Sequence, residues 1–245
     1  MTDWEDLGLR YLVGDGNFYY YDHITAKKKI DCLNKFRYLS PNEYDNFKHN
    51  EKEPTYEEKK IINKYYIGSK RSWILNNKLR TGQNLKDEEI KLANLLKDVC
   101  QRNSCPDFII LRRYVAFNFL AQYDITFDKF NEASARKGLD LIKKKLIYNI
   151  VRAEKGFMSA SYGKTGFDYR AILLLLYCPK GVRMYVTDND KETEVILQYG
   201  MHYIFFDAYL ERVVNEEYGY NFYRIVICCF VMGKDKYEIY EQLFK

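Results

Sequence analysis

The sequence predicts an α+β domain in which helices come first and antiparallel strands follow. Apolar residues recur with helical spacing over 56–68 and 85–102, whereas short apolar segments bounded by turns dominate from residue 107 onward. The chain has 245 residues, of which 47% are hydrophobic and 30% charged, so it can bury a sizeable core. We therefore expect one large domain with an extension.

The first helix is expected to begin after Thr55, because threonine caps helix N-termini and the acidic residues Glu57 and Glu58 follow in the first turn. The segment KDEEIKLANLLKDVC (86–100) places its apolar residues mostly on one face, as an amphipathic helix does. A third helical pattern occupies 126–150, where leucine and isoleucine residues are spaced for one face.

Short strands are predicted after these helices, separated by turns. The predicted strands are 107–115, 156–162, 171–177, 183–186, 193–197, 202–210 and 222–231. Residues 1–54 mix aromatic residues with glycines and end in the polar stretch KHNEKEP. We expect 1–54 to be an N-terminal extension, acting as a recognition or capping element, and 55–245 to be the main domain.

Composition excludes several classes of protein. The longest apolar runs, AILLLLYC and IVICCFVM, are far shorter than the ~20 residues of a membrane-spanning helix. The net charge of +5 is spread along the chain and does not by itself favour a nucleic-acid partner. The 6 cysteines form no C-x-x-C pair and the 3 histidines complete no zinc set, so no metal is expected. No signal peptide is visible at the start of the chain.

Three short motifs follow one another along the chain. Arg112 follows the apolar segment DFIIL, and Ser159 and Ser161 lie two residues apart in GFMSASY. Glu192 and Glu194 come last, in ETEVIL. Residues i and i+2 of a strand point to the same face, so we expect each pair to stand side by side. Acidic residues number 34, so a single Glu-x-Glu is expected by chance, and the order of the motifs carries the prediction.

This order, arginine then Ser-x-Ser then Glu-x-Glu, resembles the bacterial toxin-type mono-ADP-ribosyltransferases. The nearest patterns are those of binary actin-modifying toxins and single-domain exoenzymes. KYYIGSKRSWILNNKLR (64–80) is similar to the family's Y-T-G-S…I-N-x-x-L-R segment, and FDYRAILLLLYCPKGVRMYV (167–186) to its F-x-x-R strand with a Pro-Lys-Gly turn. The resemblance covers about 55–207. It implies helices packed on two roughly perpendicular antiparallel sheets with a cleft between them.

The resemblance gives each carboxylate a role in splitting NAD. Breaking the bond between nicotinamide and ribose leaves positive charge on the ribose, which a neighbouring carboxylate stabilises. The resemblance assigns this role to Glu194, with Ser159 holding its side chain by a hydrogen bond. It assigns Glu192 to the incoming nucleophile. In the family a glutamate at this position goes with arginine acceptors.

The other site residues are assigned to NAD binding. Arg112 supplies an always-charged fork suited to a pyrophosphate, although its neighbour Arg113 leaves the register open by one residue. Ser161 is expected to support the network of Ser159.

Motif matches add three more candidates for NAD binding. Phe167 and Arg170 match F-x-x-R, and Tyr66 matches the tyrosine of the Y-T-G-S segment.

The sequence therefore predicts an enzyme that moves ADP-ribose from NAD to a protein side chain, with arginine as the indicated acceptor, and releases nicotinamide. It is expected to be secreted or delivered into the cytoplasm of a target cell. One alternative keeps the site and changes the acceptor to a nucleic acid, a small molecule or water, the last giving an NAD glycohydrolase. A more distant alternative is a non-enzymatic binding protein that uses 1–54 for recognition. The turn before Glu192 is shorter than in the actin-modifying toxins, so actin is not assumed as the acceptor.

Overall fold

The computed structural model describes residues 35–40, 42–44, 53–67, 69–127, 130–147, 151–163, 170–189, 193–215 and 219–232. Its helices are α3 (Tyr56–Tyr65), α4 (Lys70–Thr81), α5 (Asp87–Arg102), the 3-10 helix η1 (Phe117–Tyr123) and α6 (Glu132–Lys145). Its strands are β1 (Ile109–Val115), β2 (Val151–Glu154), β3 (Met158–Ser161), β4 (Ile172–Cys178), β5 (Met184–Val186), β6 (Glu194–Leu197), β7 (Met201–Asn215) and β8 (Tyr220–Met232). The predicted α+β class is confirmed.

The helices begin where their capping residues predict. Thr55 accepts a hydrogen bond from the backbone of Glu58, whose carboxylate accepts one from the backbone of Thr55, so a complete capping box starts α3. α4 ends at Gly82, whose φ of 70° lies in the left-handed region that glycine adopts without strain. The third predicted helix is shorter than expected: the pattern extends over 126–150, whereas α6 covers Glu132–Lys145.

The strands form one hydrogen-bonded sheet with the order β2-β7-β8-β4-β1-β3-β6-β5. The two antiparallel sheets that the resemblance implies are joined in this sheet, in which β4 and β8 are parallel. The expected division is visible between β1 and β3, which among the described residues are joined through one register pair, Arg112↔Ser161. Two parts of the sheet, β2-β7-β8-β4-β1 and β3-β6-β5, therefore meet at one narrow seam.

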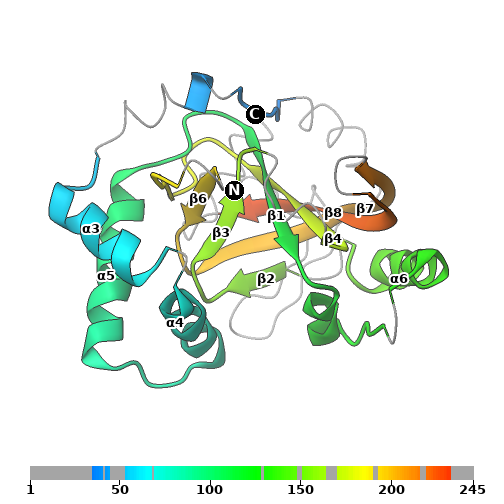
Figure 1. Cartoon of the computed structure of the whole chain (residues 1–245), viewed down its shortest axis with the longest axis horizontal. Helices are drawn as coiled ribbons and strands as arrows, with labels where there is room; N and C mark the ends of the chain where they lie inside the picture. The colour runs from blue at the N-terminus through cyan, green and yellow to red at the C-terminus, as the bar shows by residue number, and fades with distance from the viewer. Residues whose placement is uncertain are drawn as a thin grey trace, which may run out of the picture.

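One face of the sheet carries the largest hydrophobic cluster, here called the main core. Strand residues such as Leu111, Leu174 and Leu197 belong to it, and so do Leu120 of η1 and Ile142 of α6. α6 and η1 therefore cover this face. Figure 1 shows α6 at one end of the sheet and α3, α4 and α5 gathered at the other.

The opposite face carries two smaller clusters, because residues that alternate along a strand point to opposite sides. The helix cluster joins the outer face of β3, β5 and β6 to α3, α4 and α5, and includes Ile62, Tyr66, Leu75, Leu96, Phe157, Tyr185 and Ile196. The N-terminal cluster lies on β1, β4, β7 and β8, and consists of Phe36, Ile110, Leu173, Leu175, Phe206, Val226 and Cys228.

The described part of the predicted N-terminal extension packs on the sheet. Arg37 forms a parallel bridge with Ile109, in which the backbone of Arg37 donates to Phe108 and its carbonyl accepts from Ile110. Phe36 is buried in the N-terminal cluster. The division of the chain at residue 54 remains a prediction.

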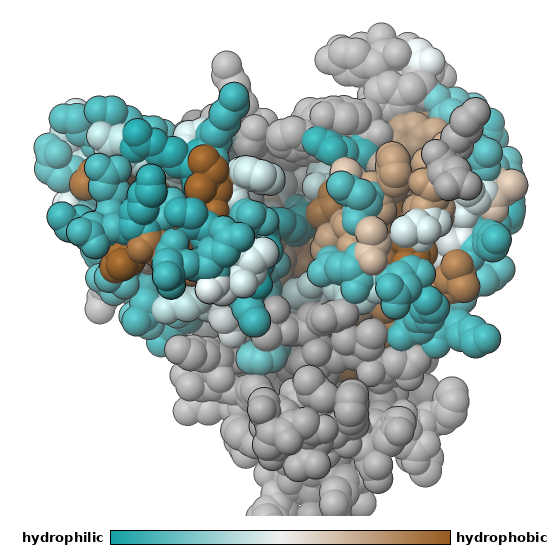
Figure 2. Space-filling view, turned by 90° about the horizontal axis from the view of Figure 1, so that it is seen from below, coloured by the Kyte–Doolittle hydropathy of each residue, from teal (hydrophilic) through white to brown (hydrophobic). Residues whose placement is uncertain are grey.

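The surface differs between the two ends of the molecule. Figure 2 shows mostly hydrophilic residues over the side of α3, α4 and α5, whereas apolar residues gather on the side of η1 and α6. At that end the rings of Phe117, Phe127 and Phe130 contact one another, and Phe117 is 41% exposed. Within the described ranges, no helix has the length and hydrophobicity to cross a membrane.

Candidate active site

Three of the predicted residues lie in one row across three neighbouring strands. Arg112 of β1 is directly opposite Ser161 of β3, and Ser161 is directly opposite Glu194 of β6. Residues paired in this way share a face, and their Cα atoms lie about 4.5–5.5 Å apart in an antiparallel ladder. The row crosses the seam between the two parts of the sheet.

The row lies between the two smaller clusters, on the face that they share. Leu175, which is opposite Arg112, belongs to the N-terminal cluster. Ile196, two residues beyond Glu194, belongs to the helix cluster. The helices therefore lie on one side of the row and the N-terminal segment on the other.

Glu194 is held by the serine that the sequence predicts. The Ser159 hydroxyl donates to a carboxylate oxygen of Glu194 at 2.5 Å. The Glu194 residue is only 7% exposed, at the first position of β6. A hydrogen bond to a buried carboxylate restricts its rotamer, which is the positioning that a charge-stabilising group needs.

Ser161 is hydrogen-bonded to the turn that precedes Glu194. Its hydroxyl lies 2.5 Å from the hydroxyl of Thr193, and the backbone of Gly163 donates to both oxygens. Thr193 has a φ of 45°, a left-handed conformation that strains a β-branched residue unless its surroundings hold it. Ser161 therefore fixes the residue immediately before Glu194.

The shared strand face of Glu192 and Glu194 remains a prediction. β6 begins at Glu194, and the residue before it, Thr193, is left-handed. Glu192 itself lies outside the described residues, as does Phe167.

Arg112 and Arg113 have opposite environments although they are neighbours. The Arg112 guanidinium donates to the carbonyl of Tyr162 at 3.3 Å and lies 4.1 Å from the ring centroid of Tyr38. Arg113 points to the other face, and its guanidinium donates to the carbonyl of Ser159. Burial lowers the pKa of Arg113, because the charged form is desolvated.

The remaining candidates within the described residues are Tyr66 and Arg170. Tyr66 is 2% exposed, and its hydroxyl accepts from the side chain of Asn76 at 2.9 Å. Burial raises the pKa of Tyr66, and the charge of Glu194 raises it further. Asn76 also accepts from the backbone of Phe157, which ties α4 to the start of β3. Arg170 precedes β4, and its carbonyl accepts from the Arg224 guanidinium at 3.0 Å.

Comparison with family models matches residues 42–225 to the ADP-ribosyltransferase exoenzyme family. The chain belongs to this family. It is a bacterial toxin-type mono-ADP-ribosyltransferase, an enzyme that uses NAD as the donor of ADP-ribose. The comparison with curated proteins finds no match.

Solved structures show the same fold. An ADP-ribosyltransferase from Clostridium botulinum is 18% identical with a TM-score of 0.62, over 80% of this chain and 98% of that one. A protein from S. aureus, solved with NAD, is 18% identical with a TM-score of 0.61, over 82% and 100%. An ADP-ribosyltransferase toxin from Paenibacillus larvae is 21% identical with a TM-score of 0.58, over 86% and 97%.

Sequence reasoning missed two parts of the candidate site. The contact of Tyr38 with Arg112 depends on pairing between distant segments, and nothing near Tyr38 in the sequence signals it. The left-handed conformation of Thr193 was missed because threonine normally favours strands. Gly163 offered the one signal, since a glycine two residues after Ser161 permits close approach: a Cβ there would lie 2.9 Å from the Thr193 hydroxyl.

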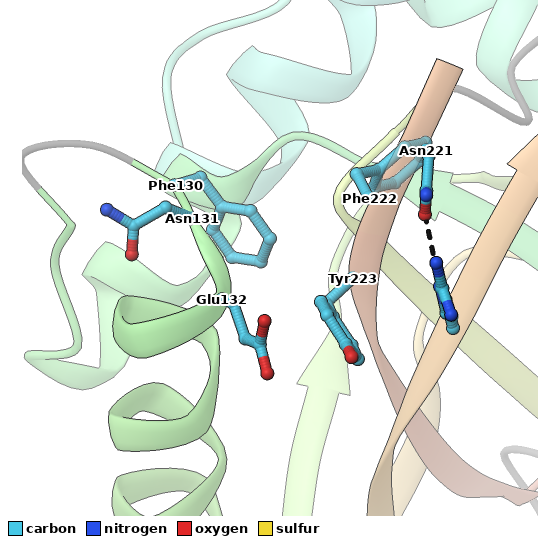
Figure 3. A pocket seen from close by; sticks show the side chains of 7 residues that line it. Phe130, Asn131, Glu132, Asn221, Phe222 and Tyr223 are labelled. Atoms are coloured by element: carbon cyan, nitrogen blue, oxygen red, sulfur yellow. Dashed lines mark hydrogen bonds between the residues drawn. The ribbon is translucent and has the colours of Figure 1, made fainter. Parts of the chain in front are cut away.

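A separate pocket of the transferase lies between the start of α6 and the β7–β8 hairpin (Figure 3). It has a volume of about 540 Å³ and is lined by the rings of Phe130, Phe222 and Tyr223. Arg212 donates to Asn221 at its edge. None of the predicted site residues lines this pocket.

Proposed function

We propose that Glu194, Ser159 and Arg112 split NAD in this enzyme, and that the ADP-ribose goes to an arginine side chain of a protein. The observation that carries this proposal is the row across β1, β3 and β6, in which a serine-held carboxylate and an arginine lie on one face.

Glu194 stabilises the charge that develops on the ribose. The bond between the ribose and the nicotinamide nitrogen breaks, and its electron pair leaves with nicotinamide. The ribose becomes oxocarbenium-like, and a preorganised carboxylate is most effective beside it in a water-poor site. The burial of Glu194 and its bond to Ser159 support this role.

Arg112 binds the pyrophosphate of NAD. Its guanidinium lies on the face of the row, and among the described residues only the Tyr162 carbonyl accepts a hydrogen bond from it. The remaining donors can therefore meet an anion, and a planar fork suits phosphate oxygens. Arg113 is unsuited to this role, since it points to the opposite face, where it donates to the Ser159 carbonyl.

Glu192 activates the acceptor. This assignment follows the family pattern of the E-T-E motif. A guanidine nitrogen of the acceptor attacks the ribose carbon and passes its proton to the Glu192 carboxylate. Phe167, Arg170 and Tyr66 remain proposed contacts or supports for NAD, and the enzyme is proposed to act after delivery into a target cell.

One paired assay tests the proposed function. The enzyme is incubated with NAD, with and without a lysate of whole cells, and both the released nicotinamide and the label on protein are measured. Protein labelled on arginine, located by mass spectrometry, is the expected result. Nicotinamide release without any label would make the enzyme an NAD glycohydrolase. Label on nucleic acid would mean that the acceptor is a nucleic acid and not a protein. No nicotinamide release would contradict the proposal as a whole.

A further inference from the structure

We propose that Tyr38 is a positioning residue of the NAD site, which holds the Arg112 guanidinium in the orientation that receives the pyrophosphate. This inference rests on the proposed function of Arg112. Tyr38 lies before the family match, which begins at residue 42, and within the segment that the sequence predicts to be an extension.

The contact itself is close and well oriented for a cation. The Arg112 carbon Cζ lies 4.1 Å from the centroid of the Tyr38 ring, within the ~6 Å over which an aromatic face attracts a guanidinium. The ring covers one side of the guanidinium, and the hydrogen bond to the Tyr162 carbonyl fixes one of its nitrogens. A planar group held in this way keeps its other N–H donors in a defined plane.

Tyr162 is itself fixed from the N-terminal side. Its ring stacks on that of Tyr44, with centroids 3.5 Å apart and planes 14° from parallel. Tyr44 is 1% exposed in the main core. Both of these contacts of Arg112, the Tyr38 ring and the Tyr162 carbonyl, therefore depend on the segment 35–44.

The neighbours of Tyr38 explain why its ring stays in place. Phe36 is 6% exposed and meets the rings of Phe108 and Tyr177 edge-on, each at 5.3 Å. Arg37 is bound to β1 through its backbone, and its side chain pairs with Glu43 at 2.7 Å and Asp107 at 3.2 Å. Exposed ion pairs contribute little, so the burial of Phe36 provides most of the anchoring.

Tyr38 is also poorly explained as a core residue. It is 42% exposed, so the ring is not needed to fill the interior. The half-exposed Tyr38 ring lies against Arg112, the arginine of the row, and its placement is explained if it orients that guanidinium. Its removal should therefore affect NAD binding more than folding.

The test compares Tyr38→Leu with Tyr38→Phe in steady-state assays of nicotinamide release. We expect Tyr38→Leu to raise the KM for NAD roughly threefold to tenfold, the range of an exposed to partly desolvated cation–π contact, with kcat nearly unchanged. Tyr38→Phe keeps the ring and should have the same KM for NAD as the wild type. The unfolding temperature without NAD should match that of the wild type. Tyr56→Leu is a control, because Tyr56 is 77% exposed at the start of α3.

A double-mutant cycle shows whether Tyr38 acts through Arg112. In an Arg112→Gln background, Tyr38→Leu should add nothing to the KM, since the group that the ring positions is gone. The proposal is overturned if Tyr38→Leu keeps the wild-type KM, or if Tyr38→Phe raises the KM as much as Tyr38→Leu does. It is also overturned if the increases in KM caused by Arg112→Gln and Tyr38→Leu multiply in the double variant. An error in the proposed function of Arg112 would give a different result, because Arg112→Gln alone would then leave the KM for NAD unchanged.

Discussion

At the scale of single residues, Arg112 and Arg113 show how one position along a strand separates two functions. Arg112 shares its face with Ser161 and Glu194, whereas Arg113 points to the other face and donates to the Ser159 carbonyl. Arg113 therefore supports the strand that carries Ser159, and Arg112 is the arginine proposed to bind the substrate. The sequence alone left this choice open.

Lysine substitutions at the two arginines should have different signatures. Arg112→Lys keeps the charge but loses the planar fork, so we expect a raised KM for NAD and a smaller thermal shift on adding NAD. Arg113→Lys should instead lower the unfolding temperature, because it disrupts a partly buried hydrogen bond, at a cost of about 1–3 kcal/mol in the free energy of unfolding. The shift produced by NAD should be retained. If Arg113→Lys gave the greater loss of NAD binding, the arginine that binds the pyrophosphate would be Arg113 and not Arg112.

The hydrogen bond between Ser159 and Glu194 agrees with the role that the motif order predicted. It could be predicted because the resemblance to the transferase family assigns Ser159 to hold the Glu194 side chain. The contact of Tyr38 with Arg112 could not, because it depends on which distant segment pairs with the start of β1. Local periodicity carries no information about such pairing.

At the scale of elements, the turn into β6 determines how Glu194 is presented. The hydroxyls of Ser161 and Thr193 and the backbone of Gly163 form a small network that holds Thr193 at a φ of 45°. Strain of this kind persists only where the surrounding groups maintain it. We infer that the network, more than the strand ladder, fixes the start of β6.

Thr193→Val tests this network, because valine keeps the shape and removes the hydroxyl. Loss of about 1–2 kcal/mol of hydrogen bonding should reduce kcat for nicotinamide release by roughly fivefold to thirtyfold. Thr193→Ser keeps the hydroxyl and is the matched control. Full activity in Thr193→Val would mean that Glu194 is positioned without the turn.

Most elements were predictable because their apolar periodicity is strong. All of the predicted strands are found, and the predicted starts of α3 and α5 are close to the observed ones. β2 and η1 were missed for physical reasons. β2 is only 4 residues long, too short for the alternation in its sequence VRAE to stand out, and its pairing with β7 defines it. η1 is a 3-10 helix, whose period is tighter than that of an α-helix, and no side chain caps its start.

At the scale of the whole molecule, the narrow seam between β1 and β3 explains where the candidate site lies. The two smaller clusters cover the same face on either side of this seam, and the row of polar residues lies between them. A fold that packs helices on one part of the sheet and an N-terminal segment on the other thus leaves the side chains of the candidate site at their junction.

Glu192→Ala tests the division of labour within the enzyme. We expect protein labelling to be lost while nicotinamide release persists, because water can still capture the ribose that Glu194 stabilises. Both activities are measured on one preparation, in the presence of the same lysate. Equal loss of the two activities would show that the glutamates act as one unit.

The central claim is that Glu194 provides the charge that drives the cleavage of NAD. The most direct measurement is nicotinamide release by Glu194→Gln, which keeps the size of the side chain and removes its charge, together with thermal stabilisation by NAD. The account predicts a fall in rate of about 10²–10³, the scale for removing one preorganised electrostatic group, with the stabilisation by NAD retained. A variant that released nicotinamide at nearly the wild-type rate would contradict the account.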